Sequence, residues 1–359
     1  MPVTISEDIT GVASVNSGAI GGRRNIVYNG EMKVAQRGTV TSVTSGTYGG
    51  PDRFVLGEVG ALVVTLSQDT DVPTGQGFAN SMKIDVTTAD SSLAAGDLVY
   101  LGQRLEGQDL QQLKKGTSSA ESVTLSFWVK TTITGTYIIQ LYDKDNSRHI
   151  SKSYTVSSTN TWEHKTLTFA GDTTGALDDD NLYSLQIYWG LAAGSNYTDG
   201  TLTTSWAAWN DGNAAVGQVN AVNSASNNIY ITGVQLEIGA TATDFEHRTF
   251  GDELALCQRY YQQQFTFNGY ASNTTTIQAS APCIISMRAT PTLSAGGVLT
   301  VTDGAANYAQ SSLSITGVTG TPNGISFNAP NFSSLTQFRP CMNNGTASSV
   351  GSLAYSAEL

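Results

Sequence analysis

The sequence has few basic residues and no long apolar run, and each shortage excludes a class of protein. Lys and Arg total 18 against 29 Asp and Glu, so the net charge is −11, and charged residues make up only 13% of the 359 residues. Nucleic-acid binding needs clustered Lys and Arg, but the densest basic clusters are the pairs Arg23–Arg24 and Lys114–Lys115. No apolar run approaches the roughly 18 residues that span a bilayer. We therefore expect no nucleic-acid partner and no membrane insertion.

Cysteine is also scarce, which argues against a disulfide-stabilised fold. Cys257, Cys283 and Cys341 are an odd number and lie far apart in the sequence, unlike the paired spacings of a disulfide framework. We expect reduced thiols, with a Cys283–Cys341 pair as the alternative. Residues 1–18 lack the charged and apolar regions of a secretory signal, so we expect the chain to fold in a cytoplasm.

The abundant residues favour β-structure. Gly numbers 37, and Thr, Ser and Asn are frequent. All four residue types are unfavourable in helix interiors. Hydrophobic residues make up 40%, enough to argue against disorder. Short alternating runs separated by turns predict strands at 26–33, 61–67, 81–87, 98–105, 122–131, 136–142, 150–157, 162–170, 182–190, 202–208 and 229–238. Strands at this spacing indicate an all-β protein with a jelly-roll β-sandwich.

Two helices interrupt the predicted strands. A short one is expected at 107–115. The other is a connector helix, with Asp252 as the N-cap and with Leu254, Cys257 and Tyr261 on one face. Beyond it, the strands carry small side chains and bury little apolar area each, so a domain of this size would be marginal alone. The expected organisation is an N-terminal arm at 1–25, a jelly-roll domain at 26–250, a connector helix at 251–264 and a small C-terminal β-domain at 265–359.

Catalytic and metal-binding patterns are largely missing. His149, His164 and His247 lie far apart, and the sequence contains neither a GxSxG elbow nor a Walker loop. We therefore expect no catalytic residue, no bound metal and no cofactor. Asp172 with Asp178–Asp180 could supply oxygen ligands for calcium, although an EF-hand spacing is absent and a solvated loop is the alternative. Carboxylates for glycoside hydrolysis would converge only in space, and the sequence offers the candidates Glu106, Glu237 and Glu246.

Aromatic residues give the strongest indication of binding. In the run 122–130, alternation places Phe127 on the apolar face and Trp128 on the opposite face. The same reasoning predicts that the non-core face of one sheet carries Trp128, Gln140, Tyr142, Gln186, Tyr188 and Gln235. A second aromatic cluster is expected from Tyr197, Trp206 and Trp209. Flat rings stack on the C–H faces of sugars, and amides bond to hydroxyls, so these residues are candidate glycan-binding residues. The alternative is that loops or a neighbouring subunit cover the rings.

Several segments are similar to parts of one known family. They are RRNIVYNGEMKVAQRGT from Arg23, the DRF turn at Asp52–Phe54, SVTLSFWVKTT from Ser122, ITGVQLEIGATATDFEHRTFGDELALCQRYYQ from Ile231, SMRATPTL at Ser286–Leu293 and the terminal SAEL. Together they resemble bacteriophage virion fibre proteins of the tail or head that contain a jelly roll like that of carbohydrate-binding modules. The resemblance covers about residues 23–290 and the final residues.

This resemblance implies a non-enzymatic appendage of the virion, made in the cytoplasm of the bacterial host. It implies that residues 1–25 attach to other virion proteins and that the jelly roll displays a surface for host glycans. It also implies a homotrimer, for which the C-terminal domain offers the inward candidates Ile285, Met287, Leu293 and Ile315. Two alternatives stay open: a capsid decoration or cement protein without a ligand, and a polysaccharide depolymerase.

Overall fold

The computed structural model describes residues 14–15, 18–19, 23–264, 266–343 and 352–359. The chain divides into two compact units, Met1–Thr249 (unit 1) and Phe250–Leu359 (unit 2). Most of the expected arm, residues 1–25, lies outside the described residues. The exceptions are residues 23–25 and the short hairpin of β1 (Ser14–Val15) and β2 (Gly18–Ala19). Within the described ranges, no helix is both long enough and apolar enough to cross a bilayer.

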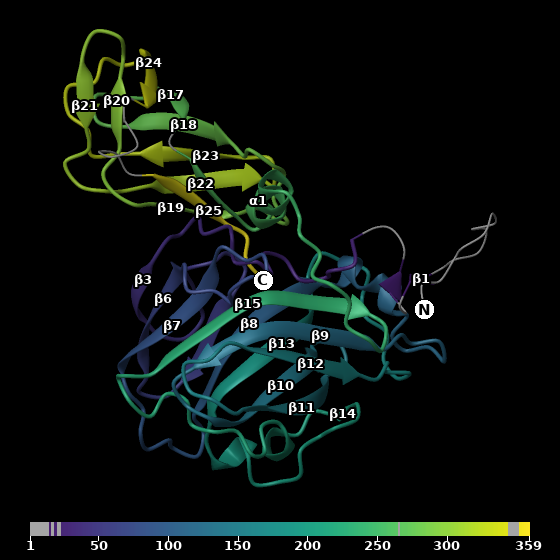
Figure 1. The fold of residues 1–359 in the computed structure, drawn as a ribbon. Coiled ribbons are helices and arrows are strands. Elements are labelled where there is room, and N and C mark those ends of the chain that lie inside the picture. The colour runs from purple at the N-terminus through teal and green to yellow at the C-terminus, as the bar shows by residue number, and fades with distance from the viewer. Residues whose placement is uncertain (1–13, 16–17, 20–22, 265, 344–351) are drawn as a thin grey trace. The chain divides into compact units, whose positions relative to one another are not determined.

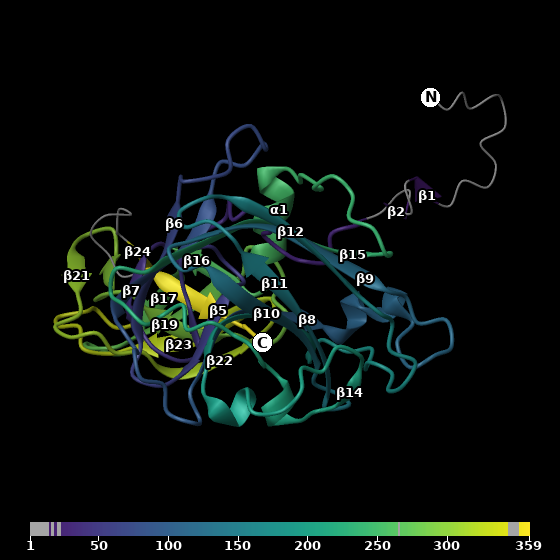
Figure 2. The ribbon, with the colours of Figure 1, turned by 60° about the horizontal axis from the view of Figure 1, so that its bottom comes forward.

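Unit 1 consists of two main antiparallel sheets (Figures 1 and 2). The six-stranded sheet has the order β12 (Glu163–Phe169), β9 (Val123–Thr131), β15 (Asn228–Ile238), β7 (Ser81–Thr88), β6 (Val63–Asp69), β3 (Val40–Val43). The seven-stranded sheet has the order β14 (Ala207–Ala208), β11 (Arg148–Val156), β10 (Gly135–Asp143), β13 (Tyr183–Ala193), β8 (Leu98–Glu106), β5 (Val55–Val59), β4 (Thr47–Tyr48). From β8 to β15 the chain passes repeatedly between the sheets. The expected all-β, jelly-roll architecture is confirmed.

Aromatic side chains from both sheets meet in the core of unit 1. Phe127 on β9 contacts Tyr154 on β11 and Trp189 on β13, with ring centroids 5.2 Å and 6.1 Å apart. Trp189 and Phe127 are fully buried. Edge-to-face ring contacts of this kind add to the free energy gained by burial. The two sheets therefore pack face to face around these rings.

The strand expected at 26–33 is wrong, because this segment is a buried loop. Asn29 and Met32 have φ values of 56° and 59°, a left-handed conformation outside the region of regular strands. The Asn25 side chain accepts hydrogen bonds from the backbone N–H groups of Val27 and Leu236 and donates one to a backbone carbonyl of β15. The loop is buried on several sides, and this gives it an alternating pattern of apolar residues. A sequence pattern with a period of two does not distinguish such a loop from a strand.

Other differences are smaller. The helix expected at 107–115 consists of two short 3-10 turns, η1 (Gly107–Asp109) and η2 (Gln111–Leu113), and only Ala207–Ala208 of the strand expected at 202–208 is formed. The strands β3, β4 and β5 have no counterpart among the expected ones. The sequence thus predicted the long strands, whose alternation is sustained, better than the short ones.

Unit 2 begins with the helix α1 (Phe250–Gln258), which is shorter than the connector expected at 251–264, because Tyr261–Gln264 forms strand β16. The three-stranded sheet has the order β16, β25 (Leu353–Ser356), β19 (Thr292–Ala295). The seven-stranded sheet of unit 2 has the order β21 (Asn307–Ala309), β20 (Thr300–Thr302), β24 (Pro340–Asn343), β17 (Asn268–Ala271), β18 (Ile277–Pro282), β23 (Gly324–Ala329), β22 (Thr316–Thr321).

Unit 2 has a hydrophobic core of its own, and this corrects one of the expected trimer contacts, Met287. Met287 is buried in that core, and Leu293 and Ile315 pack against it. These side chains already have partners within one chain, while Ile285 is half-buried.

The three cysteines also lie in unit 2, and none of them forms a disulfide with another described cysteine. Cys257 and Cys341 are buried and Cys283 is half-buried. The alternative pairing of Cys283 with Cys341 is therefore not formed.

A buried ionic network stabilises one end of unit 1. The Lys115 ammonium forms ion pairs with Asp143 and, at 2.9 Å, with Asp172, and Arg148 binds the same Asp172 carboxylate through Nε at 2.7 Å. Burial alone would raise the pKa of Asp172, but the hydrogen bonds from Arg148 and Lys115 hold it below its usual value. Asp172 is thus neutralised by side chains of the chain itself. Among the described residues, no cluster of three or more carboxylate, His or Cys side chains is arranged to hold a metal ion.

Replacing Lys115 tests the contribution of this network. Lys115→Met leaves two buried carboxylates with less compensation, so we expect the free energy of unfolding to fall by about 3–5 kcal/mol. The matched control is Lys114→Met, because the neighbouring Lys114 forms only an exposed ion pair with Glu121, worth less than about 1 kcal/mol. Urea unfolding followed by tryptophan fluorescence measures both. Equal losses of unfolding free energy in the two variants would contradict a stabilising role for the buried ionic network.

Candidate functional site

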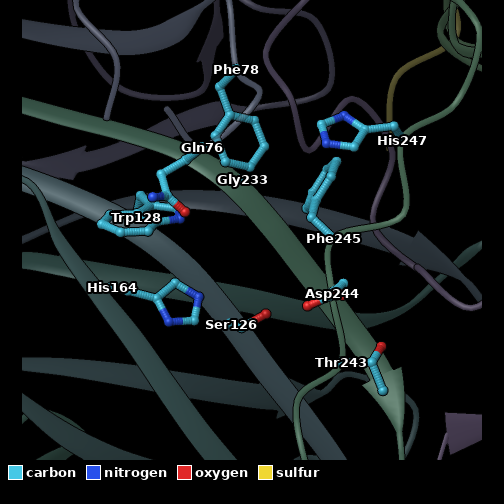
Figure 3. Close-up of a pocket in the computed structure, with 10 residues that line it drawn as sticks. All are labelled: Gln76, Phe78, Ser126, Trp128, His164, Gly233, Thr243, Asp244, Phe245 and His247. Atoms are coloured by element: carbon cyan, nitrogen blue, oxygen red, sulfur yellow. The ribbon is translucent and has the colours of Figure 1, made fainter. Parts of the chain in front are cut away.

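A pocket of about 510 Å³ opens on the outer face of the six-stranded sheet. Strand alternation produces it, since Phe127 points into the core while its neighbour Trp128 points outward. The pocket volume lies within the range of small-molecule sites. The lining residues, shown in Figure 3, are Gln76, Phe78, Ser126, Trp128, His164, Gly233, Thr243, Asp244, Phe245 and His247.

A glycine bulge forms the floor of the pocket. Thr232 and Gln235 of β15 pair with Trp128 and Ser126 of β9, so β15 contains one extra residue between these pairs. Gly233 lies at this point with a φ of 61°. A Cβ atom there would approach Phe78 to 2.6 Å and Trp128 to 3.1 Å. Glycine is therefore required both for the backbone conformation and for space between the two rings.

The aromatic rings form two groups on opposite sides of β15 (Figure 3). Trp128 and His164, which pair across β9 and β12, have centroids 5.0 Å apart. Phe78, Phe245 and His247 contact one another at centroid distances of 5.0–5.6 Å. Both groups border the same pocket and offer apolar ring surface to a ligand.

The segment 239–249, here called the strap, is fastened over the sheet by buried side chains. Glu237 accepts hydrogen bonds from the Thr243 backbone N–H at 2.8 Å and from its hydroxyl at 2.6 Å. Gln235 accepts one from the backbone N–H of Glu246 at 2.8 Å. Both Gln235 and Glu237 are buried. Gln235, a predicted glycan contact, thus positions the strap that carries Phe245 and His247.

The lining contains donors and acceptors but no Lys or Arg. Ser126, Thr243 and Gln76 supply hydroxyl and amide groups, and Asp244 is an exposed carboxylate at the rim. Partial burial, with a smaller effect of Lys165, holds the pKa of His164 below its usual 6.5. His164 is therefore neutral at pH 7, with one ring nitrogen donating and the other accepting. Such a lining suits an uncharged, hydroxyl-rich ligand.

The other predicted sheet residues lie elsewhere, so the expectation that one sheet face carries all six is wrong. Trp128 and Gln235 belong to the six-stranded sheet, but β10 and β13, which carry the other four, belong to the seven-stranded sheet. The reason is that alternation indicates whether a side chain faces the core but not which sheet contains its strand. The four residues on the other sheet are Gln140, Tyr142, Gln186 and Tyr188.

On the seven-stranded sheet the aromatic side chains cover one another. Tyr188 contacts Tyr100 at a centroid distance of 4.2 Å, and Trp209 closes over Tyr142 at 4.9 Å. Gln140 and Gln186 beneath them are buried. The space left beside Tyr188 and Trp209 is about 30 Å³, enough for one or two water molecules. This space is too small for a sugar ring, so the rings here are covered as the alternative foresaw.

Tyr197, Trp206 and Trp209, expected to form a cluster, contact different partners. The Trp206 ring covers the Lys115 ammonium at 5.0 Å, and its N–H donates to the Ala170 carbonyl. Trp209 packs on Tyr142, as described above, and Tyr197 lies in the turn η3 (Ser195–Tyr197). Only Trp128 among the predicted aromatic residues borders the large pocket.

The carboxylates proposed for hydrolysis are engaged in structural contacts. Glu237 holds the strap, and Glu246 accepts hydrogen bonds from the backbone N–H groups of Arg24 and Asn25 at 3.1 Å and 2.9 Å. Glu106 is fully buried and accepts a hydrogen bond from Gln108. Each of the three has a fixed hydrogen-bonding role.

Strand alternation does not indicate the pocket residues that come from loops, because loops have no period. These residues are Gln76, Phe78, Thr243, Asp244, Phe245 and His247. A glycine within an otherwise alternating strand, as at Gly233, is the sequence signal that could have located the pocket floor.

Comparisons with known proteins found structural similarity only. No family model and no curated protein sequence matches the chain. A tailspike protein 4 enzymatically active domain of bacteriophage CBA120 is similar over 55% of this chain, with 19% identity and a TM-score of 0.32, and the chain covers about a fifth (21%) of that tailspike. A family 11 carbohydrate-binding module from Clostridium thermocellum, in complex with a mixed-linked tetrasaccharide, is similar over 53% of this chain and 91% of its own, with 13% identity and a TM-score of 0.29. The module TmCBM61, in complex with β-1,4-galactotriose, is similar over 60% and 99%, with 10% identity and a TM-score of 0.32.

The buried His149 predicts a dependence of stability on pH. It is fully buried beside Trp209, and burial lowers its pKa below 6.5. Below pH 6.5 the unfolded chain takes up a proton at His149 that the folded chain does not, so the free energy of unfolding should decrease as the pH falls from 7 to 5. His149→Gln should reduce this slope by up to about 1 kcal/mol per pH unit.

The control for this measurement is His247→Gln, which removes an exposed histidine. Urea titrations at several pH values give the slopes. An unchanged slope in His149→Gln would contradict a role for burial at this position.

Proposed function

We propose that unit 1 is a glycan-binding module whose site is the pocket around Trp128. The observation that carries the proposal is the combination of two aromatic groups facing one pocket of about 510 Å³ with a lining of hydroxyl, amide and neutral imidazole groups. Rings stack on the apolar faces of sugars, and the polar groups bond to hydroxyls. On the seven-stranded sheet, similar residue types leave only about 30 Å³ of space beside Tyr188 and Trp209.

Binding at this site should be weak for a single module. Stacking on one indole contributes about 1 kcal/mol beyond burial, by analogy with ring pairs, so we expect dissociation constants on the order of millimolar to tens of micromolar. Display of many copies would increase the effective affinity.

Trp128→Ala tests the site. Trp128 is half-buried and outside the core, so the variant should keep a melting temperature near that of the wild type but lose at least tenfold in glycan affinity. The control is Trp206→Ala, a half-buried tryptophan that is not part of the pocket lining, which should bind as the wild type does. Glycan arrays followed by isothermal titration measure binding. Unchanged binding in Trp128→Ala would exclude this pocket as the site.

We propose further that the chain is a non-enzymatic appendage of a bacteriophage virion, attached through residues 1–25. The sequence segments from Arg23 to Leu293 that resemble phage fibre proteins support this role. The structural use of Glu106, Glu237 and Glu246 supports binding without hydrolysis. Antibodies against unit 1 should label purified particles in electron micrographs, and a chain lacking residues 1–22 should fold but not incorporate. Release of reducing ends from host polysaccharide would contradict a purely binding role.

We propose that the chain forms a homotrimer through unit 2. Among the described residues of unit 2, eight large hydrophobic side chains are exposed, and the edge strand β22 is exposed along its whole length. Light scattering should therefore report about three times 37.8 kDa, and a cooperatively folded monomer at micromolar concentration would exclude the trimer. The exposed side chains are Phe250, Tyr270, Ile284, Val298, Leu313, Val318, Phe338 and Met342.

A further inference from the structure

A second aromatic patch lies on the outer face of the six-stranded sheet, outside the lining of the Trp128 pocket. It consists of Tyr230 on β15 and Trp162, which directly precedes β12. The two rings are 6.3 Å apart at their centroids with an interplanar angle of 65°. Both residues are half-buried, so neither is enclosed in the core.

The strand register places this patch next to the pocket. On β9 and β15, Trp128 pairs with Thr232 and Lys130 pairs with Tyr230. Residues two apart in a strand share a face, and a strand rises about 3.3 Å per residue. The row that contains Tyr230 therefore follows the row that contains Trp128 after about 7 Å along the same face. A chain-like ligand bound at Trp128 and continuing along the strands would reach Tyr230.

The patch differs from the pocket in charge. The ammonium groups of Lys83 and Lys130 lie 5.8 Å and 5.2 Å from the centroid of the Tyr230 ring. Lys83 is on β7, directly opposite Tyr230 in the register. Two cations at one ring are notable in a chain of net charge −11, because the acidic surface would otherwise repel an anionic ligand.

Asp71 distinguishes the two lysines. Its carboxylate forms an ion pair with Lys130 and accepts the indole N–H of Trp162 at 2.9 Å. Burial alone would raise the pKa of Asp71, but these hydrogen bonds lower it below its usual value. Lys130 is thus neutralised while Asp71 fixes the Trp162 ring. The charge of Lys83 contributes a smaller part to the lowered pKa of Asp71, but over the described part of the chain Lys83 forms no ion pair, so its ammonium can contact a ligand.

We infer that Tyr230, Trp162 and Lys83 form a second subsite that binds an acidic sugar of the same glycan chain whose neighbouring sugar occupies the Trp128 pocket. This inference rests on the proposed function, and it defines the ligand class as an anionic polysaccharide with carboxylate-bearing residues. The Lys83 ammonium binds the carboxylate, the two rings contact the sugar, and the cation-free pocket takes an uncharged neighbour.

A matched pair of ligands tests the inference. The probes are oligosaccharides of four to eight sugars from uronate-containing bacterial polysaccharides, each in its native form and after chemical reduction of the carboxylates to neutral hydroxymethyl groups. Wild-type protein should bind the native form about fivefold to tenfold more tightly, as a charge-assisted contact requires. Lys83→Gln should abolish this preference without weakening the binding of the reduced form.

Two further variants separate the subsites. Tyr230→Ala should weaken both forms of the oligosaccharide, whereas Trp128→Ala should abolish binding of both. The charge control is Lys152→Gln, which removes another half-buried lysine, on β11 of the other sheet, and it should bind as the wild type does. Circular dichroism melting confirms that each variant is folded.

The outcomes distinguish failure of the inference from failure of the proposed function. Equal binding of native and reduced chains by the wild type, or an unchanged preference in Lys83→Gln, would overturn the acidic subsite while leaving glycan binding at Trp128 intact. Absence of binding to every probe and to the glycan array would overturn the proposed function itself, and the inference with it.

Discussion

The bulge at Gly233 is the constraint on which both the pocket of unit 1 and the attachment of its N-terminal loop to β15 depend. The extra residue removes Val234 from the ladder with β9. Instead, its N–H donates to the Gly30 carbonyl at 3.0 Å, and its carbonyl accepts from the Asn25 amide at 2.9 Å. A Cβ at Gly30 would lie 2.1 Å from that carbonyl. One irregularity therefore anchors the N-terminal loop and, through Gly233, leaves space for the two rings at the pocket floor.

The outer faces of the two sheets carry similar residue types. They differ in whether segments outside the strands cover those residues, and this determines which face is accessible to a ligand. Each outer face carries aromatic and amide side chains at alternate positions. On the seven-stranded sheet, Trp209 from the segment 190–228 lies over Tyr142, and the amides beneath are enclosed. On the six-stranded sheet, the strap is held along one side by Gln235 and Glu237, so the rings border an open pocket. The same residue types serve packing on one sheet and exposure on the other.

The sequence predicted the long strands because their two faces lie in different environments. The strands around Phe127 and Ile187 were located to within three residues at each end, since apolar side chains alternate with polar ones there. The loop after Asn25 was mistaken for a strand because it is buried on several sides. At the site, the alternating pattern correctly predicted that Trp128 faces away from the core. The pattern could not predict which sheet contains each strand. The strap residues depend on contacts with distant Gln235 and Glu237, which no local pattern records.

The network around Lys115 has a consequence for the behaviour of unit 1 on heating. Two buried carboxylates are compensated there by an ammonium and a guanidinium of the same chain. The cost of removing such groups from water falls as the temperature rises, because hydration of charges loses free energy on warming. The hydrophobic contribution per unit area reaches a plateau instead. This end of the sandwich should therefore lose less of its stability on warming than the aromatic core around Trp189, so that thermal unfolding begins away from the ionic network.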